Sequence, residues 1–502
     1  MVLHPLSKSQ YLKGRHCIRR VWLYNWHREL MQPPSEVQQS IFQQGHDVGR
    51  LAHQLFPGGI EITEDHNDPA GALSSTQVAI QSGAPAVFEA AFEFDSILIR
   101  TDILAKNNDG SWSLHEVKSS TKVKDEHFQD VAVQKYVLDH CGFNIRNANL
   151  IHLNHQFVRQ GEISPEKLFT TETLDRNDKF IEAYAEIPIY LARIRDALAK
   201  DEVPEQMLGS ICKNPYECEF KSHCWASVPA NSIHYLVDIR DKKREALLSM
   251  GIDEVGNIPD SFALSENQRV QVHAERLGKA IIDYDAIKKH LQELSYPLWF
   301  VDFETVGFAI PAYDGTKPYE HLPFQFSLHV QAEPGGSLEH HEFLFDEKSD
   351  SRRNLAATLC SLVGDEGSII AYHASFEAGR IKELAQLCPE LSTKLQSMLG
   401  RIWDLEKPFA ERWYCHPQFH GRSSLKSVLP VVVPELSYDD MEIGKGDLAQ
   451  LKYTEMLDLL KTSEAHRKIK KDLLAYCGQD TFAMVKILAV LTRQIALSSN
   501  KC

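Results

Sequence analysis

The sequence has no excess of positive charge. Its 502 residues carry 54 Lys and Arg against 69 Asp and Glu, which gives a formal net charge of −15. A protein that holds nucleic acid by bulk electrostatics is usually basic, so the composition disfavours this class. An enzyme that reaches phosphate through bound cations is not excluded, because its site is itself built of carboxylates.

The sequence also lacks a long apolar run. No segment is predicted to cross a bilayer, and the N-terminal MVLHPLSKSQYLKGRH has no apolar core of the kind a signal peptide needs. We therefore expect a cytoplasmic protein without membrane contact. An apolar fraction of 43% and a charged fraction of 25% are typical of globular proteins, and the length allows two or three domains.

The sequence also lacks the closely spaced cysteine pairs that zinc ribbons use. Cys212, Cys218 and Cys224 follow one another with five residues between them, and Cys17 stands alone near the N-terminus. Four thiolates can hold a 4Fe–4S cluster or a zinc ion, and buried thiols without metal are the alternative. Buried free thiols are also expected for the scattered cysteines, which are Cys141, Cys360, Cys388, Cys415, Cys477 and Cys502.

Local patterns predict an α/β protein with an N-terminal domain at 1–230, a helical linker at 231–295 and a C-terminal domain at 296–502. The first domain begins with mostly helical residues. It continues with three strands, a helix, a strand and a helix, expected at 86–94, 97–104, 111–118, 127–142, 147–154 and 174–200. A hairpin turn is expected at 106–110, because Asn and Gly tolerate positive φ. In the second domain we expect strands, a strand–loop–helix unit and a closing helix at 296–305, 324–330, 340–345, 368–385 and 468–497.

The first acidic group follows from the predicted hairpin. Asp102 ends the second strand, while Glu116 and Lys118 lie two residues apart on the third strand and so share a face. Two carboxylates can hold Mg²⁺ or Mn²⁺, and a lysine beside them can orient the attacking water. Phosphodiester hydrolysis needs this combination of activated water and charge neutralisation at phosphorus.

This pattern resembles the PD-(D/E)XK nuclease superfamily, above all its RecB/AddB-like branch and the CRISPR-associated iron–sulfur exonucleases. The resemblance covers about the first 230 residues and implies a restriction-endonuclease-like fold. It implies that Asp102 and Glu116 are metal ligands and that Lys118 is the catalytic lysine. Further members of the site would be the helical glutamine, the acid on the preceding strand and an N-terminal histidine ligand, which correspond to Gln134, Glu89 and either His46 or His53.

The same resemblance gives the cysteines a role. The iron–sulfur members place one cysteine before the nuclease core and three after it, which matches Cys17, Cys212, Cys218 and Cys224. These four would bind a 4Fe–4S cluster that staples the start of the domain to its end. The family often has a tighter C-terminal pair than this chain has.

A second acidic group lies in the C-terminal domain. Asp302 and Glu304 are two residues apart on a strand, and Tyr476 and Asp480 are four apart on a helix, so each pair shares a face. The pattern resembles the DEDD family of 3′–5′ exonucleases, which has an RNase H-like fold. In that family the acids bind two metal ions and the tyrosine positions water.

This chain departs from the middle motif of that family. The family has Asp after Phe, whereas this chain has Glu377 in HASFE, and Asp404 is a further candidate acid. The whole arrangement looks like a bacterial family of two-nuclease proteins known by a C-terminal domain of unknown function.

Together the resemblances imply a metal-dependent deoxyribonuclease that degrades single-stranded DNA or DNA ends in repair, recombination or defence. An RNA-degrading exonuclease and a non-catalytic iron–sulfur subunit that binds nucleic acid are the alternatives. The sequence does not identify protein partners.

Overall fold

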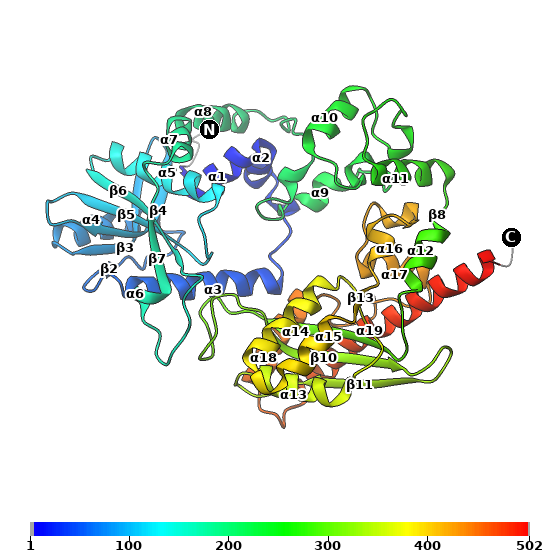
Figure 1. The fold of residues 1–502 in the computed structure, drawn as a ribbon. Helices are drawn as coiled ribbons and strands as arrows, with labels where there is room; N and C mark the ends of the chain where they lie inside the picture. The colour runs from blue at the N-terminus through cyan, green and yellow to red at the C-terminus, as the bar shows by residue number, and fades with distance from the viewer. Residues whose placement is uncertain (1–4, 500–502) are drawn as a thin grey trace. The chain divides into compact units, whose positions relative to one another are not determined.

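The computed structural model describes residues 5–499, which divide into two compact units. Unit 1 comprises residues 1–227 and 308–320, and unit 2 comprises 228–307 and 321–502. Unit 1 is therefore discontinuous in sequence, and residues 231–295 belong to unit 2. Each unit is built on its own mixed sheet with helices around it (Figure 1), which confirms the predicted α/β class.

The sheet of unit 1 runs in the order β2-β3-β4-β5-β6-β7, and β1 pairs with β4 in parallel. The strands are β1 (Leu6–Ser7), β2 (Ile60–Glu61), β3 (Ala86–Phe94), β4 (Ile97–Lys106), β5 (Trp112–Lys118), β6 (Ile145–Leu153) and β7 (Phe169–Thr173). The predicted meander β3-β4-β5 is antiparallel, and β6 joins β5 in parallel. Gly110 ends the turn between β4 and β5 with φ 84°, a conformation that glycine adopts without strain.

Helices cover both faces of this sheet. They are α1 (Lys8–His16), α2 (Ile18–Trp26), α3 (Glu36–His53), α4 (Pro69–Gln81), α5 (Asp125–His140), α6 (Pro165–Leu168), α7 (Asp178–Ala185), α8 (Ile187–Leu198) and α9 (Lys221–Trp225). The prediction of one helix over 174–200 is wrong, because α7 ends at Ala185 and Pro188 opens the first turn of α8. Proline suits a first turn, where its missing N–H costs no hydrogen bond.

The sheet of unit 2 runs in the order β11-β10-β9-β12-β13. Its strands are β9 (Leu298–Val306), β10 (Leu322–Gln331), β11 (Leu338–Leu344), β12 (Ser368–Ala371) and β13 (Ile402–Asp404). β9, β10 and β11 are antiparallel neighbours, whereas β12 and β13 continue from β9 in parallel. A small separate pair joins β8 (Ile281–Ile282) to β14 (Tyr414–Cys415).

Two apolar cores pack against this sheet, and a third lies in the helical region before it. The helices of unit 2 are α10 (Asp241–Ser249), α11 (Glu266–Leu277), α12 (Tyr284–Leu291), α13 (Arg352–Leu362), α14 (Ser375–Leu387), α15 (Ser392–Leu399), α16 (Lys407–Ala410), α17 (Leu425–Val432), α18 (Gly446–Asp458) and α19 (Glu464–Ser499). α19 packs along β9 and β10, and the Gln325 side chain donates to the Leu473 carbonyl over 2.8 Å.

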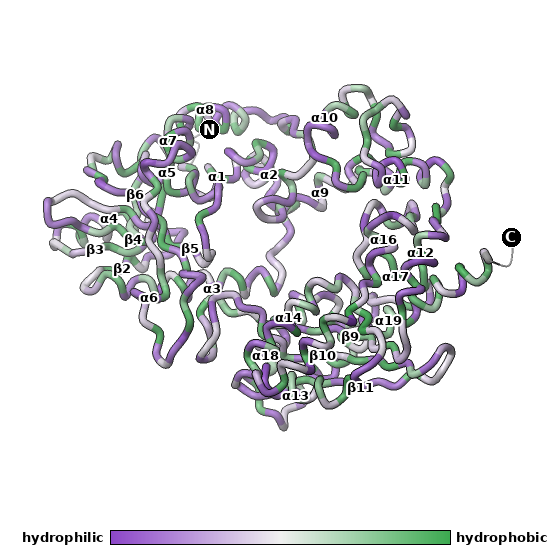
Figure 2. Tube along the Cα trace, viewed as in Figure 1, coloured by the Kyte–Doolittle hydropathy of each residue, from purple (hydrophilic) through white to green (hydrophobic). Residues whose placement is uncertain are grey.

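Among the described residues, α19 alone is long and apolar enough, by length and composition, to cross a membrane. The expectation that no apolar run reaches this length is therefore wrong for α19. Burial in the core of unit 2 accounts for part of its apolar character, because Leu473, Ala483, Ile487 and Leu491 are fully buried. Hydrophobic and hydrophilic stretches alternate along the rest of the chain (Figure 2).

Candidate functional site

The first predicted acidic group assembles on two neighbouring strands of unit 1. β4 and β5 are antiparallel with Ile103 opposite His115, so Asp102 lies beside Glu116 one step further along. The Val117 N–H donates to Asp102 Oδ2 over 2.6 Å. This bond holds one carboxylate against the strand that carries the other.

Lys118 and Gln134 both bind the Glu116 carboxylate. Lys118 Nζ donates to Glu116 Oε1 over 2.5 Å, and Gln134 Nε2 donates to Oε2 over 2.6 Å. Gln134 lies on α5 and is fully buried, and its Oε1 has no hydrogen-bond partner in the described structure. An unsatisfied buried amide oxygen is costly, and it marks a place where a water molecule or ligand would bind.

Two residues that the sequence interpretation missed complete this group. Asp130 accepts from Lys118 over 2.6 Å and from Gln134 over 3.0 Å. Lys8, the first residue of α1, lies 3.0 Å from Asp130 Oδ1 and donates to both Glu116 oxygens over 3.1 and 3.2 Å. Asp130 precedes Gln134 by four residues, so helical spacing was a usable signal. The pairing of β1 with β4 that brings Lys8 close leaves no mark in the sequence.

The charges of this group partly neutralise one another. Burial raises the pKa of Glu116 to about 7, and Asp102 and Asp130 act in the same direction. Burial likewise raises the pKa of Asp102. Burial also opposes the charge of Asp130, but Lys118 and Lys8 outweigh it and hold the pKa of Asp130 well below its usual range.

On β3, Phe88 pairs with Ile103 of β4 and Ala90 pairs with Thr101. Glu89 therefore lies opposite Asp102. Its φ of 55° lies in the left-handed region, which costs a non-glycine residue about 1 kcal/mol. Burial raises the pKa of Glu89, Lys8 lowers it and Glu116 raises it further. The side chain therefore faces the same acidic group.

The two histidine candidates lie at different places on α3. His46 is exposed, and no contact that the structure describes joins it to the acidic group. His53 stacks on Phe88, the neighbour of Glu89, with ring centroids 4.0 Å apart. Burial lowers the pKa of His53, which favours the neutral imidazole that metal ions bind. Of the two, His53 is closer to the residues that flank the acids.

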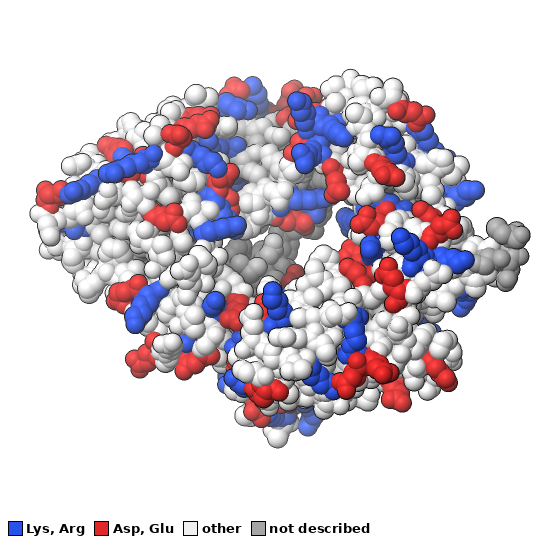
Figure 3. Space-filling view, viewed as in Figure 1, with Lys and Arg blue, Asp and Glu red and all other residues white. Residues whose placement is uncertain are grey.

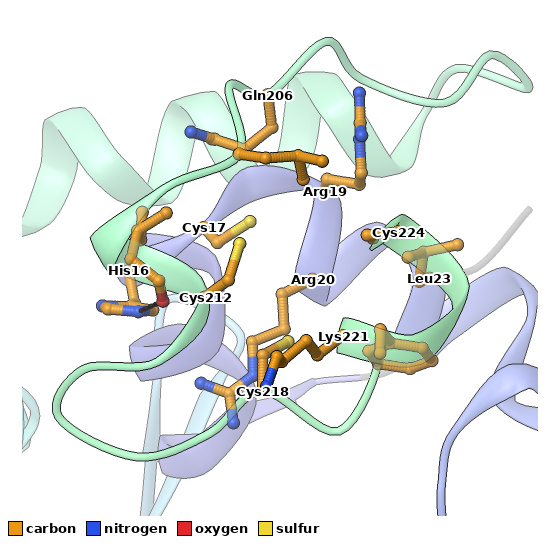
Figure 4. A pocket seen from close by; sticks show the side chains of 13 residues that line it. His16, Cys17, Arg19, Arg20, Leu23, Gln206, Cys212, Cys218, Lys221 and Cys224 are labelled. Carbon is orange, nitrogen blue, oxygen red and sulfur yellow. Dashed lines mark hydrogen bonds between the residues drawn. The ribbon is translucent and has the colours of Figure 1, made fainter. Parts of the chain in front are cut away.

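The four cysteines of the predicted cluster line one pocket of unit 1 (Figure 4). Cys17 follows α1, Cys212 and Cys218 come from the loop after α8, and Cys224 lies on α9. Cys17 and Cys212 point toward each other in Figure 4. Burial raises the pKa of Cys218 to about 11 and also raises the pKa values of Cys17 and Cys224. Other residues of the lining include His16, Arg19, Arg20, Gln206, Phe220 and Lys221.

Polar contacts around this pocket tie the start of the chain to the end of the domain. His16 Nε2 lies 2.7 Å from the Ile211 carbonyl oxygen. Arg20 forms a salt bridge with Glu219 over 2.7 Å, and Lys13 reaches the same carboxylate over 2.8 Å. Because about 200 residues separate these partners, the contacts close a long loop, whose closure entropy opposes folding.

The scattered cysteines differ from one another. Cys360, Cys388, Cys415 and Cys477 are buried free thiols, which confirms that prediction, whereas Cys141 is exposed and contradicts it. Cys141 follows the last turn of α5, where the chain leaves the core at the surface. Cys502 lies outside the described residues.

The second predicted group assembles in unit 2. Asp302 and Glu304 lie on β9, and Tyr476 and Asp480 lie on α19, which packs across that strand. The Cys477 thiol lies 3.6 Å from Asp302 Oδ2. Donor atoms of Asp302, Glu304 and Cys477 all fall within 4.8 Å of one another, the one group of this kind in the part of the chain that the structure describes.

The middle acid of this group is Glu377, in the first turn of α14. Its side chain is 3% exposed, and its Oε2 has no hydrogen-bond partner in the described structure. Burial raises its pKa to about 8, and its charge acts on both Asp302 and Glu304. Asp404 instead accepts from the backbone N–H groups of His373 and Glu406.

Like charges dominate this second group. Burial raises the pKa of Asp302 well above its usual range, and Asp480 and Glu304 add to the effect. Burial raises the pKa of Glu304 in the same way and that of Asp480 to about 6. Buried carboxylates this close favour either protons or a bound cation.

Sequence reasoning missed two further residues here. Tyr438 donates to Asp480 Oδ1 through a short hydrogen bond. Lys426, exposed on α17, donates to the Tyr476 hydroxyl over 2.9 Å. Both come from segments without a regular acidic motif, so no spacing signal indicated them.

Comparisons with known proteins identify part of the chain. Residues 299–424 match the family model described as a domain of unknown function (DUF2779). An uncharacterized protein of Mycoplasma pneumoniae is 26% identical over 230 residues, which are 42% of this chain and 34% of the relative. An uncharacterized protein of Ureaplasma parvum is 26% identical over 248 residues, 45% of this chain and 34% of the relative.

The family-model match confirms the predicted C-terminal domain of unknown function. The distant similarity to mycoplasma proteins was not predicted. The chain spans about a third of the length of the curated relatives it matches. None of these descriptions names a nuclease family, so the nuclease assignment stays a prediction.

Proposed function

We propose that this chain is a metal-dependent nuclease that hydrolyses DNA phosphodiester bonds, with its main site in unit 1. The observation that carries the proposal is the network of Glu116, Asp130, Lys118 and Gln134, joined by contacts of 2.5 to 3.0 Å. The Val117 N–H holds Asp102 beside this network over 2.6 Å. Networks of this kind are expensive to bury and are retained where chemistry needs them.

The donor set fits a hard divalent cation. Asp102 and Glu116 offer carboxylate oxygens on neighbouring strands, and such oxygens are what Mg²⁺ and Mn²⁺ prefer. A bound cation would neutralise charge on the phosphate and lower the pKa of the attacking water. Lys118 would orient that water, while Gln134 and Lys8 hold the Glu116 carboxylate in place.

The proposal includes an RNase H-like exonuclease site in unit 2. The mixed five-stranded sheet, the acids on β9 and the Tyr476–Asp480 face of α19 support it. The orphaned oxygen of Glu377 supports a role for that residue as the middle acid. We assign this site the smaller share of the activity because Glu377 replaces the aspartate that the resembled family has.

The four-cysteine pocket is proposed to hold a 4Fe–4S cluster with a structural role. A tetrahedral zinc ion with bonds of about 2.3 Å would draw its thiolates to about 3.8 Å from one another, and these four do not form so tight a group. A cluster spreads its thiolates over a larger body, and it carries negative charge that Arg19, Arg20 and Lys221 in the lining would offset.

The substrate is proposed to be DNA with single-stranded character. On the face drawn in Figure 3, Lys and Arg are interspersed with Asp and Glu. Such a surface does not favour electrostatic wrapping of a duplex, so contact with the DNA would be confined to the site itself.

Digestion of end-labelled single-stranded DNA with Mn²⁺ tests the proposal. Asp102→Asn should lower the rate at least about 100-fold, and Asp302→Asn should remove the remainder. Asp109→Asn and Asp365→Asn, at exposed positions of the two units, are matched controls and should have no effect. If Asp102→Asn and Asp302→Asn both digest DNA at the wild-type rate, the assigned sites are wrong.

Two further measurements separate the alternatives. A matched RNA strand, digested in parallel, should be cut more slowly, and faster cutting of RNA would favour the ribonuclease alternative. Anaerobically purified protein should absorb near about 400 nm, as thiolate-bound iron does. Strand binding without digestion under any cation would favour the non-catalytic subunit.

A further inference from the structure

Cys477 is a buried thiol of unit 2 that contacts the acidic group, and the proposed mechanism gives it no role. It is fully buried on α19, between Tyr476 and Gly478. Its Sγ lies 3.6 Å from Asp302 Oδ2 and 3.7 Å from the Asp302 carbonyl oxygen. The thiol is therefore on the face of α19 that meets β9, three residues before Asp480.

We propose that Cys477 is a direct ligand of the cation held by Asp302 and Glu304, so that this site takes a thiophilic divalent cation such as Zn²⁺ in preference to Mg²⁺. The inference rests on the proposed function in so far as Asp302 and Glu304 hold a cation there. It goes further in naming the cation's chemical class and a sulfur donor that the resembled exonuclease motifs do not include.

The spacing of the donors agrees with this set. A tetrahedral ion with a carboxylate oxygen at about 2.1 Å and a thiolate at about 2.3 Å places those two donors about 3.6 Å apart. The Cys477 Sγ and Asp302 Oδ2 lie at that separation. Glu304 offers a third donor within 4.8 Å of both. The triangle therefore needs little movement to close on one ion.

A further carboxylate lies near this triangle, although it is not one of the donors that fall within 4.8 Å of one another. Glu377 is 3% exposed, and its Oε2 has no hydrogen-bond partner in the described structure. Its charge acts on both Asp302 and Glu304. A buried carboxylate oxygen without a partner is destabilising unless something binds it, and a cation at this position would satisfy it.

The types of donor atom determine which cation the site prefers. Mg²⁺ requires oxygen ligands in a regular octahedron and does not take thiolate readily. Thiolate selects Zn²⁺ and other thiophilic cations, and the affinities of a mixed site rise from Mn²⁺ to Cu²⁺, with Zn²⁺ above Mn²⁺. Binding converts the Cys477 thiol to a thiolate and releases its proton to solvent.

Cadmium-113 NMR on the full-length protein tests the proposal, because Cd²⁺ reports sulfur and oxygen ligands by chemical shift. The wild type should show a resonance from a mixed oxygen–sulfur site. Cys477→Ser should shift it to an all-oxygen position and weaken Cd²⁺ binding at least about tenfold. Mn²⁺ binding should change less than about twofold, and its retention shows that the variant is folded.

Two variants provide matched controls. Cys388→Ser, at another fully buried thiol of unit 2, should leave the mixed-site resonance in place. If cadmium replaces iron in the cysteine pocket, it gives a separate all-sulfur resonance, which Cys212→Ser should change while the mixed-site resonance stays. Cys477→Ala gives a second test of the same ligand without a hydroxyl that Cd²⁺ could bind.

The outcomes separate this inference from the proposed function. If Cd²⁺ binds with an unchanged resonance in both Cys477 variants while Asp302→Asn removes one of the Mn²⁺ sites, the thiolate ligand is refuted and the carboxylate site stands. If Asp302→Asn changes the binding of neither cation, the site in unit 2 fails together with this inference.

Discussion

Both acidic groups bury carboxylates, but they differ in how positive charge offsets the buried negative charge. In unit 1, Lys8 and Lys118 bind directly to the carboxylates of Glu116 and Asp130. In unit 2, as far as the structure describes it, Lys426 is the ammonium that lowers the pKa values of Glu304 and Asp480, and its hydrogen bond goes to a tyrosine.

The difference shows in the direction of the pKa shifts. In unit 1 the pKa values of Asp102 and Glu116 are raised, but that of Asp130 is held below its usual range by two lysines. In unit 2 the pKa values of Asp302, Glu304 and Asp480 are all raised. The first group is largely neutralised by the chain itself, and the second needs protons or a cation. Of the two acidic groups, the one in unit 2 should therefore be stabilised more by a bound divalent cation.

The largest expected effect is that of Lys118→Met. The substitution keeps the length of the side chain but leaves Glu116 and Asp130 with one lysine, and breaking a buried ion pair costs about 3 kcal/mol. The free energy of unfolding in urea should fall by this amount, and the digestion rate should fall at least about 100-fold. Lys106→Met, at an exposed position of β4, is the matched control. A loss below about 1 kcal/mol would mean that Lys8 alone compensates the group.

The sequence predicted the parts of both groups that depend on local spacing. Asp102, Glu116 and Lys118 follow from strand alternation and a hairpin turn, and Tyr476 and Asp480 follow from one helical turn. The meander β3-β4-β5 needed only the turn residues of 106–110 and the alternation on either side.

The missed residues depend on contacts between distant segments. Lys8 lies 108 residues before Glu116 and comes close through the pairing of β1 with β4. Tyr438 and Lys426 reach α19 from segments 42 and 50 residues away. No periodicity records such contacts, because they arise from packing of the whole unit.

The second largest effect compares the same substitution, Glu to Gln, in the two groups. It should change the free energy of unfolding in opposite directions. Glu116→Gln removes the carboxylate that accepts from Gln134 and from the half-buried Lys8 and Lys118. Although burial raises the pKa of Glu116, loss of these bonds should lower the free energy of unfolding by about 2 kcal/mol. Glu304→Gln removes one of several crowded carboxylates and should raise it by about 1 kcal/mol. Both are measured by urea unfolding at pH 8 without divalent cations. With saturating Mn²⁺ the gain from Glu304→Gln should disappear, because a ligand of the cation is then lost.

If both substitutions change the free energy of unfolding in the same direction, the two acidic groups do not differ as proposed. Destabilisation by Glu304→Gln without cations would mean that the second group is compensated by contacts that act like those of Lys8 and Lys118. Stabilisation by Glu116→Gln would mean that the lysines of unit 1 do not offset the cost of burying the Glu116 carboxylate.

The smallest expected effect is that of Lys426→Met, which makes the same chemical change in unit 2 as Lys118→Met makes in unit 1. Lys426 is exposed, donates to the Tyr476 hydroxyl and lies over the rings of Tyr438 and Tyr476. Its loss should cost at most about 1 kcal/mol, because such contacts are weak at exposed positions. Removing one positive charge from a negative site should also tighten Mn²⁺ binding, by roughly fivefold for about 1 kcal/mol. Calorimetric titration of Mn²⁺ measures this change, and weaker binding would show that Lys426 acts by positioning Tyr476 rather than by its charge.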